Sequence, residues 1–212
     1  MITRHSMIRD IIFKYASKAH LNPELERTGL LADPHVLIDL RRPADVMIEE
    51  LLMPGGNNNR TGRGPVMRTA LDIKVINALG AKHIEATRRG PTIAAEDYHD
   101  WAMNHNNTAA ACEAAGVTYA PLVFTAQGGM AARAEAVCQQ IACRIAASTG
   151  QSQAESFAEM ADEISTSLAL QAVRARSRRS RRSLETMADA ADATRDQALW
   201  QGLDAGVDDE VG

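Results

Sequence analysis

The chain has 212 residues, of which 45% are hydrophobic and 24% are charged, which is the composition of a globular protein. This composition excludes disorder over most of the length, a collagen-like repeat and a coiled coil, and no apolar run reaches the roughly 20 residues of a membrane helix. The net charge of −4 is unevenly distributed, because residues 184–212 carry −7 and the rest of the chain carries +3.

The N-terminal half of the chain predicts one helix and two strands. Ile8, Ile12 and Tyr15 follow a helical spacing that predicts an amphipathic helix over 4–20. Residues 44–52 and 66–76 are predicted to be strands, joined by the loop 54–65, which is rich in Gly, Asn and Pro. Two strands connected in this way indicate a hairpin with a long tip.

The C-terminal half predicts a helix over 92–116, a strand over 117–126 and helices over 131–147 and 153–176. Pro121 lies inside the strand and favours an edge position or a bulge, since proline cannot donate to a central ladder. Tyr98, Trp101 and His105 fall on one stripe of the first of these helices, and we expect all three to be packed in the core. Stacking on bases would require them to be exposed.

This order of elements predicts an α/β fold with a small mixed sheet flanked by helices. Residues 1–150 are expected to form the α/β domain, and 151–176 an appended helix. Residues 177–212 form an arginine-rich and then acidic tail, which we expect to be a frayed helix or partly disordered.

Three cysteines, Cys112, Cys138 and Cys143, are odd in number and form no CxxC pair. They predict reduced, buried thiols of an intracellular protein, and the polar residues 4–10 argue against a secretory signal. His99 and His105 are six residues apart, a spacing that cannot chelate one metal easily, so no zinc is expected.

The residues with the clearest chemistry are Asp45, Asp72 and Lys74, on the two hairpin strands. Strand side chains alternate, so Asp72 and Lys74 share a face opposite to that of Ile73. A hairpin symmetric about its loop would put Asp45 opposite Lys74 and Met47 opposite Asp72. The group could be a catalytic site, with both aspartates as metal ligands, or simply a cross-strand ion pair.

Two carboxylates and a lysine suit Mg²⁺ or Mn²⁺ chemistry on a phosphodiester. Such ions take hard oxygen ligands, and the lysine can orient or deprotonate a water or neutralise the developing anion. Glu24 and Glu26, after the first helix, are candidates for the metal shell, or else a solvated pair near a turn.

Arginines supply candidate nucleic-acid contacts, DNA first and RNA second. Six lie in one run, which could also be a nuclear-import signal or a solvated helix end that pairs with the acidic segment behind it. Others flank the aspartate motif or lie at the hairpin tip. These candidates are Arg41, Arg42, Arg60, Arg63, Arg174, Arg176, Arg178, Arg179, Arg181 and Arg182.

A set of short motifs occurs in a characteristic order: Arg4-His5, Arg9-Asp10, Pro23-Glu24-Leu25-Glu26, Gly29-Leu30-Leu31, Arg41-Arg42-Pro43-Ala44-Asp45, Ala70-Leu71-Asp72, Thr108-Ala109, Gly116, Pro121-Leu122-Val123-Phe124 and Gly128-Gly129. Over roughly residues 4–176 this set resembles the PD-(D/E)XK, restriction-endonuclease-like region that follows the polymerase in non-LTR-retrotransposon-like reverse transcriptases of protists and algae. The resemblance implies an α/β nuclease core, a divalent metal and nicking of DNA to supply a primer end, with a reverse-transcriptase module as partner. Asp45 and Asp72 match the metal-binding acids of that family.

The chain departs from the family pattern in two places. Relatives commonly carry a lysine on the helix after the second strand, whereas residues 98–105 contain none and Lys74 would have to replace it. Relatives often have an acid at the position of Thr125. Two alternatives to a metal-dependent endonuclease therefore stay open: an inactive nucleic-acid-binding remnant, and a structural helical interaction protein.

Overall fold

A computed structural model describes residues 4–26, 44–49 and 68–204, with side chains described as far as residue 187. The chain divides into two compact units, residues 1–170 and 171–212. The first unit contains the sheet and all the helices except the later part of the last one.

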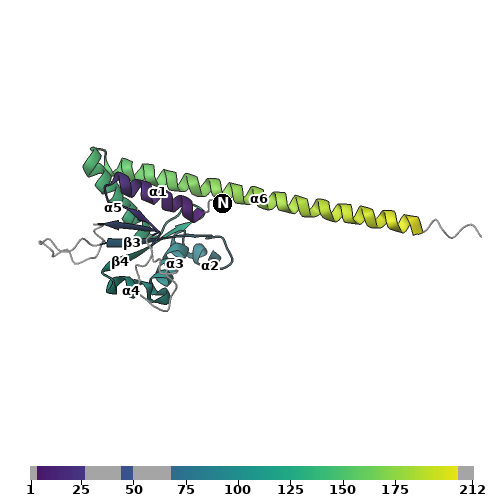
Figure 1. Cartoon of the computed structure of the whole chain (residues 1–212), viewed down its shortest axis with the longest axis horizontal. Helices are drawn as coiled ribbons and strands as arrows, with labels where there is room; N and C mark the ends of the chain where they lie inside the picture. The colour runs from purple at the N-terminus through teal and green to yellow at the C-terminus, as the bar shows by residue number, and fades with distance from the viewer. Residues whose placement is uncertain (1–3, 27–43, 50–67, 205–212) are drawn as a thin grey trace, which may run out of the picture. The chain divides into compact units, whose positions relative to one another are not determined.

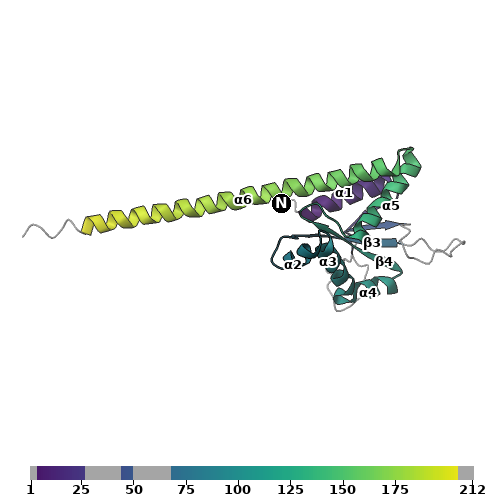
Figure 2. The ribbon, with the colours of Figure 1, turned by 180° about the vertical axis from the view of Figure 1, so that it is seen from behind.

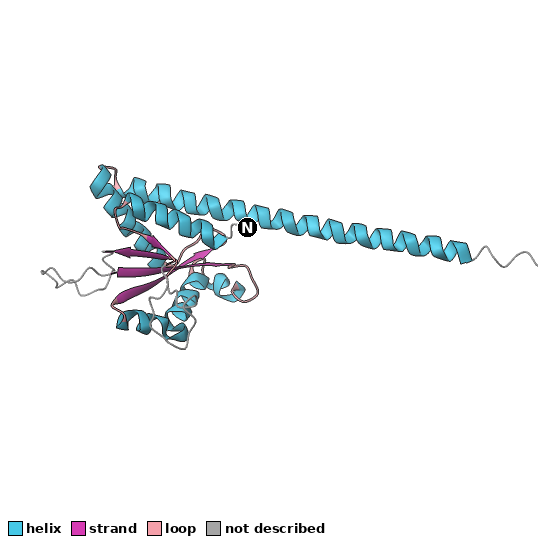
Figure 3. Cartoon of the chain, in the orientation of Figure 1, coloured by secondary structure: helices cyan, strands magenta, loops and turns pink. Residues whose placement is uncertain are grey.

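The sheet has four strands in the order β1-β2-β3-β4. Figure 3 shows the strands in magenta with helices on both sides. These are β1 (Glu24–Leu25), β2 (Val46–Glu49), β3 (Arg68–Ile76) and β4 (Val117–Thr125). The first two pairings are antiparallel and β3 pairs with β4 in parallel. The predicted α/β class, mixed sheet and hairpin pairing are therefore confirmed. Pro121 lies on the edge strand β4 without a bulge, because its register with β3 is continuous.

The helices are α1 (Arg4–Lys18), α2 (Ile84–Arg89), α3 (Ile93–Asn104), α4 (Thr108–Ala114), α5 (Ala132–Thr149) and α6 (Gln153–Asp204). The single helix predicted over 92–116 is wrong. Asn106 and Asn107 adopt left-handed backbone conformations, with φ of 52° and 54°, which end α3 and allow α4 to start in a new direction. Asparagine tolerates this region better than most residues. Neither α2 nor the two-residue β1 was predicted.

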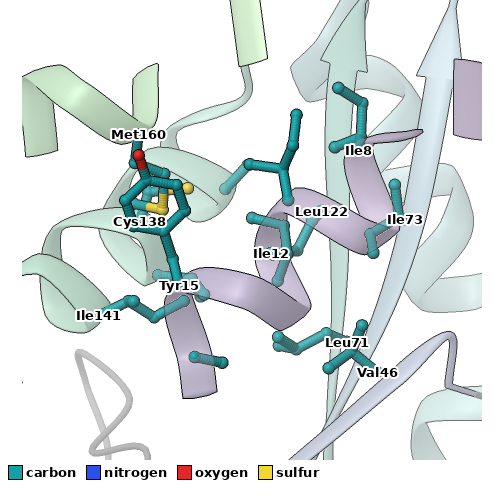
Figure 4. Packing of buried hydrophobic residues seen from close by; sticks show 14 of the residues in the cluster. Ile8, Ile12, Tyr15, Val46, Leu71, Ile73, Leu122, Cys138, Ile141 and Met160 are labelled. Atoms are coloured by element: carbon teal, nitrogen blue, oxygen red, sulfur yellow. The ribbon is translucent and has the colours of Figure 1, made fainter. Parts of the chain in front are cut away.

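One face of the sheet is covered by α1, α5 and the first part of α6, and the other by α3 and α4 (Figures 1 and 2). On the first face the apolar stripe of α1 packs against alternate residues of the strands, as Figure 4 shows for Ile8, Ile12 and Leu122. Met160 and Ile164 of α6 join the same cluster. Residues 153–168 are thus an integral layer of the first unit.

The second face carries two small apolar clusters instead of one continuous core. The first, under α4, includes Ala70, Cys112 and Tyr119. The second, under α3, includes Ile76 and Val123. The stretch of β3 between Ala70 and Ile76 is therefore where polar side chains can lie on this face.

Residues 171–204 continue α6 as helix, where the sequence predicted a helix to about 176 and then a frayed or partly disordered tail. The six arginines of the run from Arg174 to Arg182 are all exposed. By the 3.6-residue period, Arg174, Arg178 and Arg182 share one side of this helix. Among the described residues, no helix combines the length and the apolar character needed to cross a membrane.

Two expectations about individual side chains are wrong. Cys112 and Cys138 are buried free thiols, but Cys143 is exposed on α5. Trp101 is 46% exposed, because Ala94, Ala95 and Ala102 form the buried side of α3. His105 is exposed and lies just after the end of α3.

Candidate active site

The register of the hairpin places the three predicted residues. Val46 pairs with Leu71 and Met47 with Ala70, so the predicted pairing of Asp45 with Lys74 is off by two residues. Continued by one residue, the observed register sets Asp45 opposite Asp72. A shift of two leaves every side chain on its predicted face, because side chains alternate with a period of two.

Asp45 sits where β2 and β3 stop pairing through their backbones. Its N–H donates to the carbonyl of Leu71 at 2.9 Å. Its side-chain Oδ2 accepts the N–H of Ile73 at 2.7 Å, in the place where a main-chain carbonyl would continue the ladder. A short acceptor side chain is therefore required here to satisfy a part-buried amide.

Asp72 and Lys74 lie on the second face of β3, between the two apolar clusters. The ammonium of Lys74 lies 2.8 Å from Oδ1 of Asp72, and the hydroxyl of Tyr119 donates to Oδ2 at 2.7 Å. Tyr119 can do this because β4 runs parallel to β3 and pairs Ala70 with Tyr119 and Asp72 with Pro121. Tyr119 was not among the predicted site residues.

His5 is a further site residue that the prediction did not include. Its Nε2 lies 2.9 Å from Oδ2 of Asp45, so α1 supplies a side chain to the end of the hairpin. A signal was present in the sequence, since His5 precedes Ile8 and Ile12 at helical spacing and so continues the buried stripe with a polar residue. Both described hydrogen bonds to the Asp45 carboxylate engage Oδ2.

Burial and charge act differently on the two carboxylates. Burial alone would raise the pKa of Asp45, but the hydrogen bonds from His5 and Ile73 and the charges of His5 and Lys74 lower it below its ordinary value. For Asp72 burial dominates, and together with the Asp45 charge it raises the pKa against the opposing effect of Lys74 and Tyr119. Asp72 is thus a second carboxylate beside the ionised Asp45, and a positive charge nearby would stabilise the ionised form of Asp72.

Lys74 is held in its charged form. Burial lowers its pKa, but the charge of Asp72 and its hydrogen bond, with smaller effects of Asp45 and Tyr98, raise it above the ordinary value. Of the roles that the sequence leaves open to this lysine, the structure favours that of a cation over that of a base.

Glu24 and Glu26 lie on or next to β1. The N–H of Glu26 donates to the carbonyl of Asp45 at 3.0 Å, but its carboxylate binds the guanidinium of Arg9. Within the described residues, no three His, Cys, Asp or Glu side chains are close enough together to hold a metal ion. The structure therefore gathers Asp45, Asp72 and Lys74 and leaves these two glutamates outside that group.

Arg41, Arg42, Arg60 and Arg63 lie outside the described residues.

His99 uses Nδ1 in a 3.1 Å contact with the carbonyl of Pro121, which fixes α3 on β4.

The donor set fits a hard divalent cation. It consists of oxygens from two carboxylates, which are 20% and 15% exposed for Asp45 and Asp72. Such ions prefer oxygen ligands and usually keep several waters, so two protein carboxylates are sufficient. Oδ1 of Asp45 accepts no hydrogen bond from the described residues. The pKa of Asp72 is raised mainly by burial, which leaves its carboxylate poorly solvated, so a bound cation would stabilise its charged form.

Comparisons of the chain with family models, with curated proteins and with solved structures found no match. Any function therefore has to be argued from these side chains.

The His5–Asp45 pair predicts a window of pH in which it stabilises the fold. The lowered pKa of Asp45 gives stability above its ordinary value of 3.8, lost as the pH falls through the folded value. The raised pKa of His5 gives stability below its ordinary value of 6.5, lost as the pH rises through the folded value. His5→Gln should therefore cost most at pH 5.5 and least at pH 8.5.

Because His5 is 39% exposed, solvent screening limits the expected cost at pH 5.5 to about 0.5–1 kcal/mol of unfolding free energy. Denaturant unfolding at both pH values measures it. Lys14→Met, which removes the partner of Glu163 on the opposite side of α1, is the control and should cost the same at both. An equal cost of His5→Gln at both pH values would contradict the pairing.

Proposed function

We propose that this chain is a metal-dependent endonuclease that nicks DNA. The observation that carries the proposal is that Asp45, just before β2, lies across from Asp72 and near Lys74 on β3. Two partly accessible carboxylates of unequal pKa lie beside a lysine held as a cation. A structural ion pair needs only one carboxylate, whereas phosphodiester hydrolysis uses all three groups.

In the proposed reaction a water oxygen attacks phosphorus and loses its proton to solvent, the bond from phosphorus to the 3′ oxygen breaks, and the departing 3′ oxygen takes up a proton from solvent. The products are a 3′ hydroxyl and a 5′ phosphate. A divalent ion on the two aspartates would supply an acidified water and stabilise the charge on phosphorus. Lys74 adds its positive charge beside the anion that develops there.

The remaining groups hold this arrangement in place. The N–H of Ile73 and the imidazole of His5 fix the Asp45 carboxylate, and Tyr119 fixes that of Asp72. The order helix, three strands, helices and a fourth parallel strand, with both aspartates on the hairpin, supports assignment to a restriction-endonuclease-like nuclease fold.

A plasmid-nicking assay tests the proposal. Supercoiled DNA is incubated with the wild-type chain in Mg²⁺, Mn²⁺ or EDTA, and with Asp72→Ala and Lys74→Ala in Mg²⁺. Open-circular product from the wild type alone, abolished by EDTA, is the expected result. Cleavage that survives Asp72→Ala would exclude this site, and salt-sensitive DNA binding without cleavage would identify an inactive nucleic-acid-binding remnant.

The arginine run predicts a second, separable contribution to DNA binding. Six exposed arginines on a helix can contact phosphates, and if five do so the slope of log K against log salt should be about −4.5 on duplex DNA. We expect the negative charge between Glu185 and Glu210 to compete with phosphate for these arginines. Deleting 184–212 should therefore tighten binding, and deleting 174–212 should weaken it. If both deletions have the same effect in a salt titration, the run is only a solvated helix end.

A further inference from the structure

A row of aromatic side chains follows one side of α3 and its C-terminal end, from the partly buried Tyr98 to the exposed Trp101 and His105. The ring of Trp101 lies 5.0 Å from that of Tyr98 and 4.2 Å from that of His105, with which it stacks at an interplanar angle of 27°. Trp101 is 46% exposed although it is the largest side chain in this part of the molecule. Indole surface left in water beside a buried core is a feature of binding surfaces.

The row begins next to the candidate active site. His99 contacts the carbonyl of Pro121, which is the β4 residue paired with Asp72. Tyr98 packs on the cluster that contains Val123, and Val123 is the β4 residue paired with Lys74. Trp101 follows one helical turn later, which is about 5 Å further along the helix axis.

A lysine supplies positive charge beside the row. The ammonium of Lys82 lies 5.7 Å from the centre of the Trp101 ring, and within the described residues this lysine forms no salt bridge. Asp97, the acid next to Tyr98, is paired with Arg89 at 2.7 Å. A ligand that offers a flat aromatic group next to a phosphate would use both the exposed ring and the lysine.

We propose that Trp101, supported by His105 and Tyr98, stacks on an unpaired base of a DNA strand whose backbone passes Lys82 toward Asp72 and Lys74. The proposal rests on the proposed nuclease function and adds a substrate class, namely DNA with single-stranded bases beside the nick. Paired bases present only their edges, so a continuous duplex cannot fill this position. Stacking of one base on an aromatic side chain contributes about 1–3 kcal/mol, or roughly 5- to 150-fold in affinity.

The test uses the full chain with Trp200→Phe, so that Trp101 is the remaining tryptophan, in EDTA so that no cleavage occurs. A thymidine 12-mer and relaxed closed-circular duplex DNA, which has no terminal base pair, are titrated at equal nucleotide concentrations while indole fluorescence is followed. We expect the single strand to quench the fluorescence and the duplex to quench it several-fold less.

Affinity for the single strand is then compared by anisotropy in Trp101→Ala, Trp101→Phe and Leu79→Ala. The first should lose about tenfold, the second should retain most of the affinity, and the exposed Leu79 should not matter. Equal quenching by the duplex, no quenching, or unchanged affinity in Trp101→Ala would overturn the proposal. A change in oligomeric state in Trp101→Ala without quenching would overturn it too, and would indicate an interface between copies.

The outcome is independent of the nicking assay. Fluorescence quenching without Mg²⁺-dependent nicking would contradict the proposed nuclease activity and support the base-stacking site. Nicking without quenching would support the nuclease activity and contradict the base-stacking site.

Discussion

Asp45→Asn is expected to lower Mg²⁺-dependent nicking about 10³-fold while leaving the fold intact. Asparagine keeps a carbonyl oxygen that can still accept the N–H of Ile73, so the end of the β2–β3 ladder is preserved. It loses the negative charge, and with it a metal ligand whose contribution to the transition state is on the order of 4 kcal/mol. Initial rates of open-circle formation measure the effect.

Asp10→Asn is the matched control, because Asp10 pairs with Arg9 on α1 and does not contact the Asp45 carboxylate. It should nick at the wild-type rate. Circular dichroism of both variants at pH 7 should match the wild type. A folded Asp45→Asn variant that nicks within about threefold of the wild type would be incompatible with Asp45 as a ligand.

Met160→Ala is expected to destabilise the first unit by about 3 kcal/mol. Met160 is 0% exposed and packs in the cluster shared by α1, α5 and the strands. Truncating it leaves a cavity between α6 and the rest of the core. For a unit of this size the melting temperature should fall by roughly 6–12 °C.

Met187→Ala provides the same substitution on the same helix at a position that is 67% exposed. It should change the melting temperature by no more than about 1–2 °C. Equal effects of the two substitutions in thermal unfolding would mean that residues 153–170 are not part of the packed unit.

The spacing of hydrophobic residues in the sequence predicted much of the fold. The stripe of α1 depends only on the spacing of Ile8, Ile12 and Tyr15, and all three are buried as expected. The alternation around Asp72 and Lys74 placed their side chains on the right face even though the pairing register was two residues off. Periodicity specifies a face, whereas register depends on the whole loop and on what packs across the pair.

Contacts between distant segments could not be predicted in this way. His5 reaches Asp45 across 40 positions of the chain, and Tyr119 reaches Asp72 across 47. Both contacts require the packing of α1 and the parallel register of β4 to be known. The single helix predicted over 92–116 was wrong for a local reason, because the left-handed pair Asn106 and Asn107 divides a stretch whose composition suits one continuous helix.

The most direct measurement is Mn²⁺ binding by electron paramagnetic resonance on the wild type, Asp45→Asn and Asp72→Asn, in the absence of DNA. We predict one bound ion per wild-type chain, competed by Mg²⁺, and loss of that ion in both variants. Binding that is unchanged in either variant, or no binding by the wild type, would contradict a metal centre built on these two aspartates.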